Sequence, residues 1–483
     1  MSYFRGVDRN EVQLLPPCLE DYVAGNAPAR FIDVFVEGLD FQKLGFVHAE
    51  LKATGRPPYH PADLLKLYLY GYLHRIRSSR RLEAEAGRNL EVMWLLRQVR
   101  PDFKTIADFR RDNRQAFKPL FKQFNLLCRR LDLFGAELVA IDGSKFKAVN
   151  NPRRNFTQEQ LSELVQKVEE RIEEYLKELD GQDQHAEGVA AAPSRQELQD
   201  KIDLLKQQQG GYGALLDQLK ANDQNQVSLT DADARKLKGP QGNHFVGYNV
   251  QVGVDQKNHL IVAQEVVQDL NDRNQLTQMA QQAKQELEVE QLKVVADKGY
   301  HNADELEACE KAGIETFVPE QGKTSGQGKD GKKIFPKEQF RYDSQADVYE
   351  CPAGQVLRPG EVNESRGKDR VLYANRAACA SCALKDRCTT GTCRVISRRT
   401  NEAVVERAAV RLAAEPNLMP RRKELVEHVF GTLRLWGHDT FLMKGHEKVR
   451  AEFSLSALVY NLRRVLNVVG VVELLQRLQP MAV

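Results

Sequence analysis

The chain has 483 residues, a hydrophobic content of 42% and a formal net charge of +3. This length exceeds what one hydrophobic core usually holds, so two or three domains are expected, and eight cysteines in so long a chain exclude a secreted disulfide scaffold. The amino terminus carries charges where a signal peptide needs an apolar core, and no run reaches the ~18 apolar residues that span a bilayer. We therefore expect a cytoplasmic protein.

The first third of the chain is basic. Residues 51–135 carry 18 Lys/Arg against 8 Asp/Glu, whereas residues 157–209 carry 6 against 13. Apolar spacing predicts short helices within 1–135, the first from Ala62 to Ile76. Short helices with many arginines favour a helical DNA-binding domain, and an ordinary helical bundle with solvated arginines is the alternative. The arginines expected to contact DNA are Arg75, Arg77, Arg80 and Arg81.

An apolar run from Leu138 ends at Asp142 and is followed by glycine, which predicts a strand that delivers one acid to a sheet edge. Residues 156–220 then follow a different pattern, because apolar side chains recur at 4-3-4-3-4 spacing in a Glu/Gln/Lys-rich background. This heptad seam comprises Leu161, Val165, Val168, Ile172, Tyr175 and Leu179. It predicts an inserted antiparallel helical hairpin, cut short by Gly210, Gly211 and Gly213. The seam could pack on its own hairpin partner or on a second copy of the chain.

Strand patterns return at 244–254, 260–267, 292–296 and 316–319, with helices expected at 271–287 and 302–311. Together with the first strand they predict an α/β fold with a mixed sheet over 136–155 and 221–335. The 292–296 strand ends in a second carboxylate, Asp297. Further acids near this sheet, Asp231, Asp233 and Asp272, are interpreted as turn or cap residues, with a supporting role at the site or a DNA contact as the alternatives. Residues 322–333 have the composition of a linker.

A third acid, Glu427, lies in a segment whose apolar residues have helical spacing. Glu424 competes for the same role, but the apolar neighbours Val426 and Phe430 favour Glu427. Two strand-end aspartates and one helical glutamate can share Mg²⁺ or Mn²⁺, so the pattern predicts metal-dependent chemistry on phosphodiesters. Lys145 and Lys298, which follow the two aspartates, are expected to contact DNA.

Five of the eight cysteines lie between positions 351 and 393. A Cys-x2-Cys pair with further cysteines nearby predicts a structural zinc site in a small lobe over 336–395, with free thiols as the alternative. The expected ligands are Cys351, Cys379, Cys382 and Cys388, and Cys393 could replace Cys388. The isolated cysteines, Cys18, Cys128 and Cys309, are expected in hydrophobic cores.

Three motifs, Asp142-Gly-Ser-Lys, Ala296-Asp-Lys-Gly-Tyr300 and Val426-Glu-His-Val-Phe-Gly431, resemble the acidic motifs of DDE transposases from bacterial insertion sequences. Arg56-Pro-Pro-Tyr-His-Pro, Tyr460-Asn-Leu-Arg463 and the cysteine block are similar to the group of these elements numbered eleven-eighty-two. The resemblance implies a ribonuclease-H-like core in which Asp142, Asp297 and Glu427 hold two Mg²⁺ ions, with the C-terminal helices of that core at 396–470 and a tail at 471–483. It also implies nicking of the element's ends, attack of the freed 3′-hydroxyl on target double-stranded DNA, a homodimer assembled on DNA, and a nucleoid location.

Related transposases carry a Tyr-x2-Arg-x3-Glu-x6-Lys signature around the glutamate. Aligned on Glu427, this signature places Pro420 at the tyrosine, Lys423 at the arginine and Arg434 at the lysine. Lys423 and Arg434 are expected to contact phosphates. Because the tyrosine of the signature is missing, it stays open whether the reaction uses a DNA-hairpin intermediate. Two alternatives to a transposase also stay open, a ribonuclease-H-like nuclease without strand transfer and a catalytically silent, transposase-derived DNA-binding protein.

Overall fold

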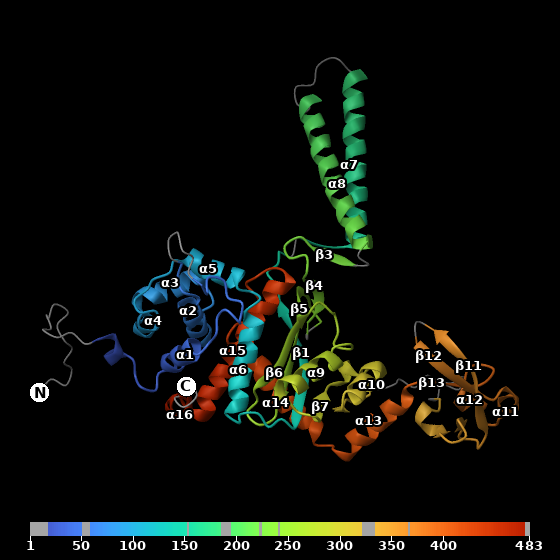
Figure 1. Cartoon of the computed structure of the whole chain (residues 1–483). Coiled ribbons are helices and arrows are strands. Elements are labelled where there is room, and N and C mark those ends of the chain that lie inside the picture. Colours follow the sequence, from blue (N-terminus) through green and yellow to red (C-terminus); the bar gives the residue numbers. More distant parts are fainter. Residues whose placement is uncertain are drawn as a thin grey trace, which may run out of the picture. The chain divides into compact units, whose positions relative to one another are not determined.

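A computed structural model describes residues 18–50, 58–151, 154–184, 195–221, 225–239, 242–320, 334–365 and 368–478. Figure 1 shows the helices and strands of the chain in sequence colours. By its contacts the chain divides into two compact units. The first unit comprises Met1–Gly135, Gly143–Leu270 and Val426–Val483, and the second comprises Ala136–Asp142 and Asn271–Leu425. The expected linker at 322–333 and most of the expected loop between the hairpin helices lie outside the described residues.

The helical amino-terminal region of the prediction is confirmed. Its central helix is α2, which is buried on nearly every side and begins at Pro61, where the fixed φ of proline suits the first helical position. This helix ends at Leu73, three residues before the expected end. The helices of the region are η1 Leu19–Tyr22, α1 Pro28–Glu37, α2 Pro61–Leu73, α3 Ser79–Arg88, α4 Leu90–Leu95, α5 Phe103–Asp112 and α6 Phe117–Arg130.

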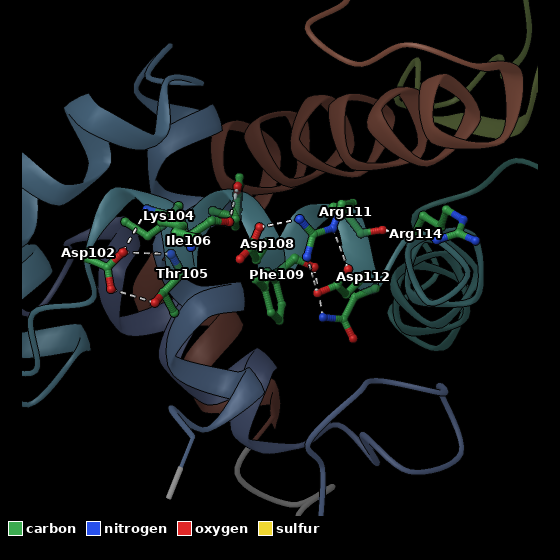
Figure 2. A network of polar contacts seen from close by, with 11 residues as sticks. Asp102, Lys104, Thr105, Ile106, Asp108, Phe109, Arg111, Asp112 and Arg114 are labelled. Carbon is green, nitrogen blue, oxygen red and sulfur yellow. Dashed lines mark hydrogen bonds and ion pairs between the residues drawn. The ribbon is translucent and has the colours of Figure 1, made fainter. Parts of the chain in front are cut away.

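Polar side chains fix both ends of α5, as Figure 2 shows. The Asp102 carboxylate caps the helix by accepting hydrogen bonds from the amides of Lys104 and Thr105, at 2.9 and 3.0 Å. Near the other end Arg111 forms ion pairs with Asp108 and Asp112, at 2.6 and 2.8 Å. These arginine contacts are exposed and contribute little stability.

In the first unit, the long strand β5 (His244–Asp255) pairs antiparallel with β4 (Arg235–Lys238) and β6 (Ile261–Val267), and neighbours β1 (Leu138–Lys147). Glycine is required where β5 passes β1, because a Cβ on Gly247 would lie 2.0 Å from the carbonyl oxygen of Phe146. The buried helix α15 (His446–Val469) packs on β6 and α6, and α16 (Val471–Leu478) follows it. Residues 471–478, within the expected tail, are helical.

The inserted hairpin consists of α7 (Gln158–Gln184) and α8 (Arg195–Ala221), and it is flanked in the chain by the paired strands β2 (Asn155–Thr157) and β3 (Gln226–Ser228). The heptad positions face the partner helix, since Val168, Ile172 and Leu179 pack with Leu198 and Ile202. The expectation that the glycines end the second helix was wrong. Helix α8 continues through all three glycines, which an exposed helical surface tolerates at a modest cost.

In the second unit, the first half of β1 pairs parallel with β7 (Leu292–Ala296), and β7 pairs parallel with β8 (Ile314–Phe317). With the antiparallel strands of the first unit, this pairing confirms the predicted mixed sheet. Helices α9 (Leu276–Leu287) and α10 (Ala303–Lys311) pack on these strands, and α13 (Glu402–Ala414) packs on α10 and β8. Helix α14 (Leu418–Leu435) contributes its first residues to the second unit and the remainder to the first.

The second unit also contains a small lobe built on five antiparallel strands in the order β13-β12-β11-β10-β9. Its core combines aromatic and aliphatic side chains and comprises Phe340, Tyr349, Leu357, Tyr373 and Ile396. The elements of the lobe are η4 Lys337–Gln339, β9 Arg341–Asp343, β10 Val348–Glu350, β11 Val356–Ser365, β12 Lys368–Ala374, α11 Arg376–Ala380, α12 Lys385–Cys388 and β13 Val395–Arg399.

Membrane-spanning segments were also sought among the described helices. None is by itself both long and apolar enough to cross a bilayer; α15 and α16 meet that test only together, across a bend of 98°.

Candidate active site

Asp142 and Asp297 occupy equivalent positions on neighbouring parallel strands of the second unit. The last registered pair between β1 and β7 is Ile141 with Ala296, and Asp142 and Asp297 are the residues that directly follow this pair along the chain. Adjacent strands lie ~4.8 Å apart, and residues in register point to the same face. The backbone therefore brings the first two predicted acids together.

Strand β1 does not end at Asp142 as expected, whereas strand β7 ends where it was expected to. Strand β1 runs on to Lys147, because Ser144 and Phe146 continue the alternation of buried side chains. Strand β7 does end at Ala296, and Asp297 caps the short helix η3 (Lys298–Tyr300) by accepting a hydrogen bond of 2.7 Å from the Gly299 amide. Asp142 thus lies within a strand, whereas Asp297 lies in the turn that was expected for both.

A third carboxylate, Asp272, accompanies this pair. Burial raises the pKa of the Tyr300 hydroxyl, and the negative charges of Asp272, Asp142 and Asp297, in that order, raise it further. A Cβ on Gly299 would lie 2.9 Å from an Asp297 oxygen and 3.8 Å from an Asp272 oxygen. The acid interpreted from sequence as a turn or cap residue therefore lies beside the predicted site.

Arg422 supplies positive charge next to Asp142. Its guanidinium lies 3.4 Å from the Asp142 carboxylate, and the two side chains are 14% and 22% exposed. The neighbouring Lys423, which was aligned with the arginine of the Tyr-x2-Arg-x3-Glu-x6-Lys signature, is exposed on α14. No local pattern marked Arg422, since its contact with β1 is made only in the folded chain.

Glu427 lies on the part of α14 that belongs to the first unit. Its side chain is exposed, as is that of its competitor Glu424, whereas Val426 and Phe430 are buried. Further along this helix, Arg434 donates a hydrogen bond of 2.6 Å to the Ser144 hydroxyl. Within the residues that the structure describes, no group of three or more His, Cys, Asp or Glu side chains is arranged to hold a metal ion.

The four arginines predicted to contact DNA differ in their surroundings. Arg75 and Arg81 are exposed, and the exposed Arg80 lies over the Phe103 ring at 5.0 Å. Arg77 is instead only 12% exposed and donates to the carbonyl groups of Thr440 and Gly437. Its guanidinium therefore connects the segment between α2 and α3 to the loop that follows α14.

The two lysines that follow the aspartates also differ. Lys145, on β1, donates a hydrogen bond of 3.1 Å to the carbonyl oxygen of Lys238, while Lys298 is exposed. Two further acids, Asp231 and Asp233, contact the start of α15. Asp231 accepts a hydrogen bond from the Gly445 amide and Asp233 accepts one from the His446 amide.

The cysteines of the lobe converge. Four of them, Cys351, Cys379, Cys382 and Cys388, line one cavity of about 30 Å³, and Cys393 is outside that lining. Burial raises the pKa of the Cys388 thiol, opposed by Arg394 and reinforced by the other three cysteines. Elsewhere Cys128 and Cys309 are buried as expected, but the expectation was wrong for Cys18, which is exposed.

Comparison with known families identifies the class of protein. Residues 217–462, just over half of the chain, match the family model described as the transposase DDE domain, and the chain therefore belongs to this family. Residues 17–112 match a second model, described as a transposase domain (DUF772). No curated protein and no solved structure matches the chain. Membership implies DNA binding and a metal-dependent nuclease and transposase activity.

Proposed function

We propose that this chain is the transposase of an insertion sequence of the eleven-eighty-two group, acting on nucleoid DNA in the cytoplasm. It nicks the ends of the element and joins the freed 3′-hydroxyl to target DNA. The observation that carries the proposal is the register of β1 and β7, which brings Asp142 and Asp297 together in a chain of the transposase DDE family. The antiparallel strands β5 and β6 and the parallel strands β1, β7 and β8 support a ribonuclease-H-like core.

In this proposal Asp142, Asp297 and Glu427 hold the catalytic cations. The chemistry of the donors fits, because carboxylate oxygens are the ligands that Mg²⁺ and Mn²⁺ prefer. When bound, a pair of such ions supplies an activated water and neutralises charge on the leaving oxygen. Without cations two carboxylates at ~4 Å repel by roughly 4 kcal/mol at an effective dielectric constant near 20. Arg422 offsets part of that repulsion at Asp142.

The remaining residues of the proposed site position the acids and the DNA. The Gly299 amide holds the Asp297 carboxylate, and Asp272 lies next to it as a supporting acid. Lys145, Lys298, Lys423 and Arg434 draw the phosphate backbone to a site that is itself negative. Two copies of the chain assemble on the paired element ends, and the exposed arginines Arg75, Arg80 and Arg81 of the 1–135 domain grip the flanking duplex.

We also propose a structural Zn²⁺ in the small lobe, held by Cys351, Cys379, Cys382 and Cys388. The four cysteines line one small cavity, and thiolates are the donors that structural zinc takes in Cys-x2-Cys proteins. The cation would fix two helices, α11 and α12, against the strands of a lobe whose apolar core is small.

The test is a cleavage and strand-transfer assay with labelled element ends in Mg²⁺. Asp297→Asn, which keeps the shape of the side chain and removes its charge, should abolish nicking and joining. The rate should fall by at least ~10³-fold, while affinity for DNA is retained, because the acid acts on the metal rather than on the duplex. Asp142→Asn and Glu427→Gln should behave alike.

Glu424→Gln is the matched control on the same helix and should keep activity. Retained nicking by Asp297→Asn would contradict the site. Nicking without joining by the unaltered chain would instead favour a nuclease.

A further inference from the structure

A cavity of about 420 Å³ lies in the first unit, at the base of the α7–α8 hairpin. Its walls come from the end of β1, the paired strands β2 and β3, the first turn of α7, and the paired strands β4 and β5. The volume falls within the ~300–1,000 Å³ typical of small-ligand pockets. None of the residues of the proposed active site lines it.

The lining of this cavity is positively charged. Lys147 and Lys236 supply this charge, His244 also lines the cavity, and all three side chains are exposed. No acidic residue is found among the described residues of the lining, although the chain contains 67 Asp and Glu. Within the described residues, neither lysine forms an ion pair. Concentrated charge of one sign in a concave surface attracts a ligand of the opposite sign, here an anion.

Aromatic and amide side chains complete the lining. Phe156 of β2 and Phe245 of β5 are both half-buried. The Phe156 ring packs against the ring of Tyr212 on α8, with the ring centroids 6.0 Å apart. Gln160 and Gln226 add hydrogen-bond donors and acceptors. Cations that suit a phosphate, aromatic faces that suit a base, and amides that suit the edge of a base are together the chemistry that recognises a nucleotide.

We propose that this cavity binds one unpaired nucleotide of a DNA strand. The inference rests on the proposed function, which makes DNA the polyanion that this chain handles. A base inside a duplex cannot stack on a half-buried ring, so the nucleotide must be unpaired or extruded. Stacking on phenylalanine tolerates any base, and the cavity therefore selects an unpaired state rather than a sequence.

The experiment uses the full chain and three fluorescein-labelled duplexes of one sequence, compared by fluorescence anisotropy. The first duplex is fully paired, the second carries one unpaired thymidine, and the third carries an abasic residue in its place. The thymidine duplex should bind about tenfold more tightly than the paired duplex, because no pairing has to be broken, and the abasic duplex should lose most of that gain.

Two variants assign this preference to the cavity. Phe245→Leu keeps an apolar side chain but removes the aromatic face, and it should bind the thymidine and paired duplexes almost equally. Phe156→Leu provides the same test from the other wall. Lys236→Gln should weaken binding of all three duplexes and lower the slope of log affinity against log salt by about 1. Lys43→Gln, an 86% exposed lysine outside the cavity, is the control and should keep the thymidine preference.

Equal binding of the thymidine and abasic duplexes, or full preference in both phenylalanine variants, would overturn the cavity assignment and leave the proposed transposase intact. Failure of the unaltered chain to bind any of the three duplexes would contradict the proposed function as well.

Discussion

His438 is 1% exposed in the first unit, where its ring contacts Tyr72 and Trp436 at centroid distances of 5.2 and 5.7 Å. Neither ring nitrogen has a hydrogen-bond partner within the described residues. Burial, together with the nearby positive charge of Arg77, lowers the pKa of this histidine to about 3. The imidazole therefore stays neutral in the folded chain at any pH at which the protein is handled.

This histidine should make stability depend on pH. In the unfolded chain the histidine pKa is ~6.5, so the imidazole is protonated below that pH, whereas it stays neutral in the folded chain. Above pH ~6.5 this titration leaves the unfolding free energy unchanged. As pH falls from there toward 3, the unfolding free energy decreases by about 1.4 kcal/mol for each pH unit. His438→Phe keeps a ring and removes the titration, so its loss of unfolding free energy between pH 7.5 and 5.0 should be smaller by ~2 kcal/mol. Equal losses in urea unfolding would contradict this account.

Single residues were predictable from sequence where the backbone pattern marks them. Asp142 and Asp297 each follow an apolar strand, so their strands and their proximity follow from local spacing. Asp272 and Arg422 have no such mark, because their positions depend on contacts with β1 and η3 that form only on folding. Arg77 was expected to contact DNA but is largely buried, because a sequence does not distinguish exposed arginines from buried ones.

At the scale of elements, α8 carries three glycines within a regular helix. A Cβ on Gly210, Gly211 or Gly213 would meet nothing within 4 Å, and none of the three has a positive φ. Each change to alanine should therefore stabilise the hairpin by roughly 0.5–1 kcal/mol, through the lower entropy of the unfolded chain. Hydrogen exchange of the hairpin amides measures this gain directly.

Gly71→Ala is the opposing control for that series. Its Cβ would lie 2.3 Å from a methyl group of Leu82 and 2.7 Å from the carbonyl oxygen of Ile76, so it should destabilise the amino-terminal helices. Faster exchange in the hairpin after the three alanine changes would argue that the glycines meet a structural need there.

The cysteine lobe gives a second prediction at this scale. The purified chain should contain one zinc per molecule by atomic absorption, and a strong chelator should unfold the lobe, because metal binding and folding are coupled in so small a core. Cys382→Ser should lose the metal, whereas Cys393→Ser, outside the cavity lining, should retain it. A chain that contains no zinc, or that loses it equally in both variants, would contradict the ligand assignment.

Elements were predictable in kind but less so in extent. The heptad spacing of 161–179 predicts the paired helices because burial on one face repeats with the helical period. The predicted ends of elements were wrong where glycine was taken to end a helix or strand but packing or pairing continues it. Glycines did not end α8, and the glycine after Asp142 did not end β1, since pairing with β5 extends that strand.

At the scale of the molecule, a buried carboxylate joins the amino-terminal helices to the sheet. Glu265 on β6 is 4% exposed and pairs with Lys118 of α6 and Arg450 of α15, at 2.7 and 2.5 Å. Burial raises the pKa of Glu265, but hydrogen bonds from Arg450 and Lys118 outweigh it and hold the pKa below the usual value. The ionised carboxylate is therefore part of the folded first unit.

Glu265→Gln should lower the unfolding free energy at neutral pH by roughly 1–3 kcal/mol, less than for a fully buried pair because both cations are partly exposed. The wild-type advantage should fade as pH drops below ~4.5, where the unfolded carboxyl group takes up its proton. Urea unfolding measures both effects. Glu473→Gln, which breaks the exposed pair with Arg477, is the matched control and should change stability by less than ~0.5 kcal/mol. A loss as small for Glu265→Gln would contradict the proposed joining role.

The division of the molecule was the least predictable feature. The sequence grouped the separate segments 136–155, 221–335 and 396–470 into one expected core, whereas the two compact units divide these segments between them, and both β1 and α14 contribute to each unit. Such grouping depends on contacts between residues hundreds of positions apart, which no local period records.

The strands β2 and β3 give the hairpin an unusual independence. Thr157 and Gln226 are direct partners in register, so the chain leaves for the arm and returns from it at neighbouring positions. Only two backbone joints connect the arm to the sheet behind it. A hairpin of another length, or a tight turn, could therefore replace this segment without changing the strands on either side of it.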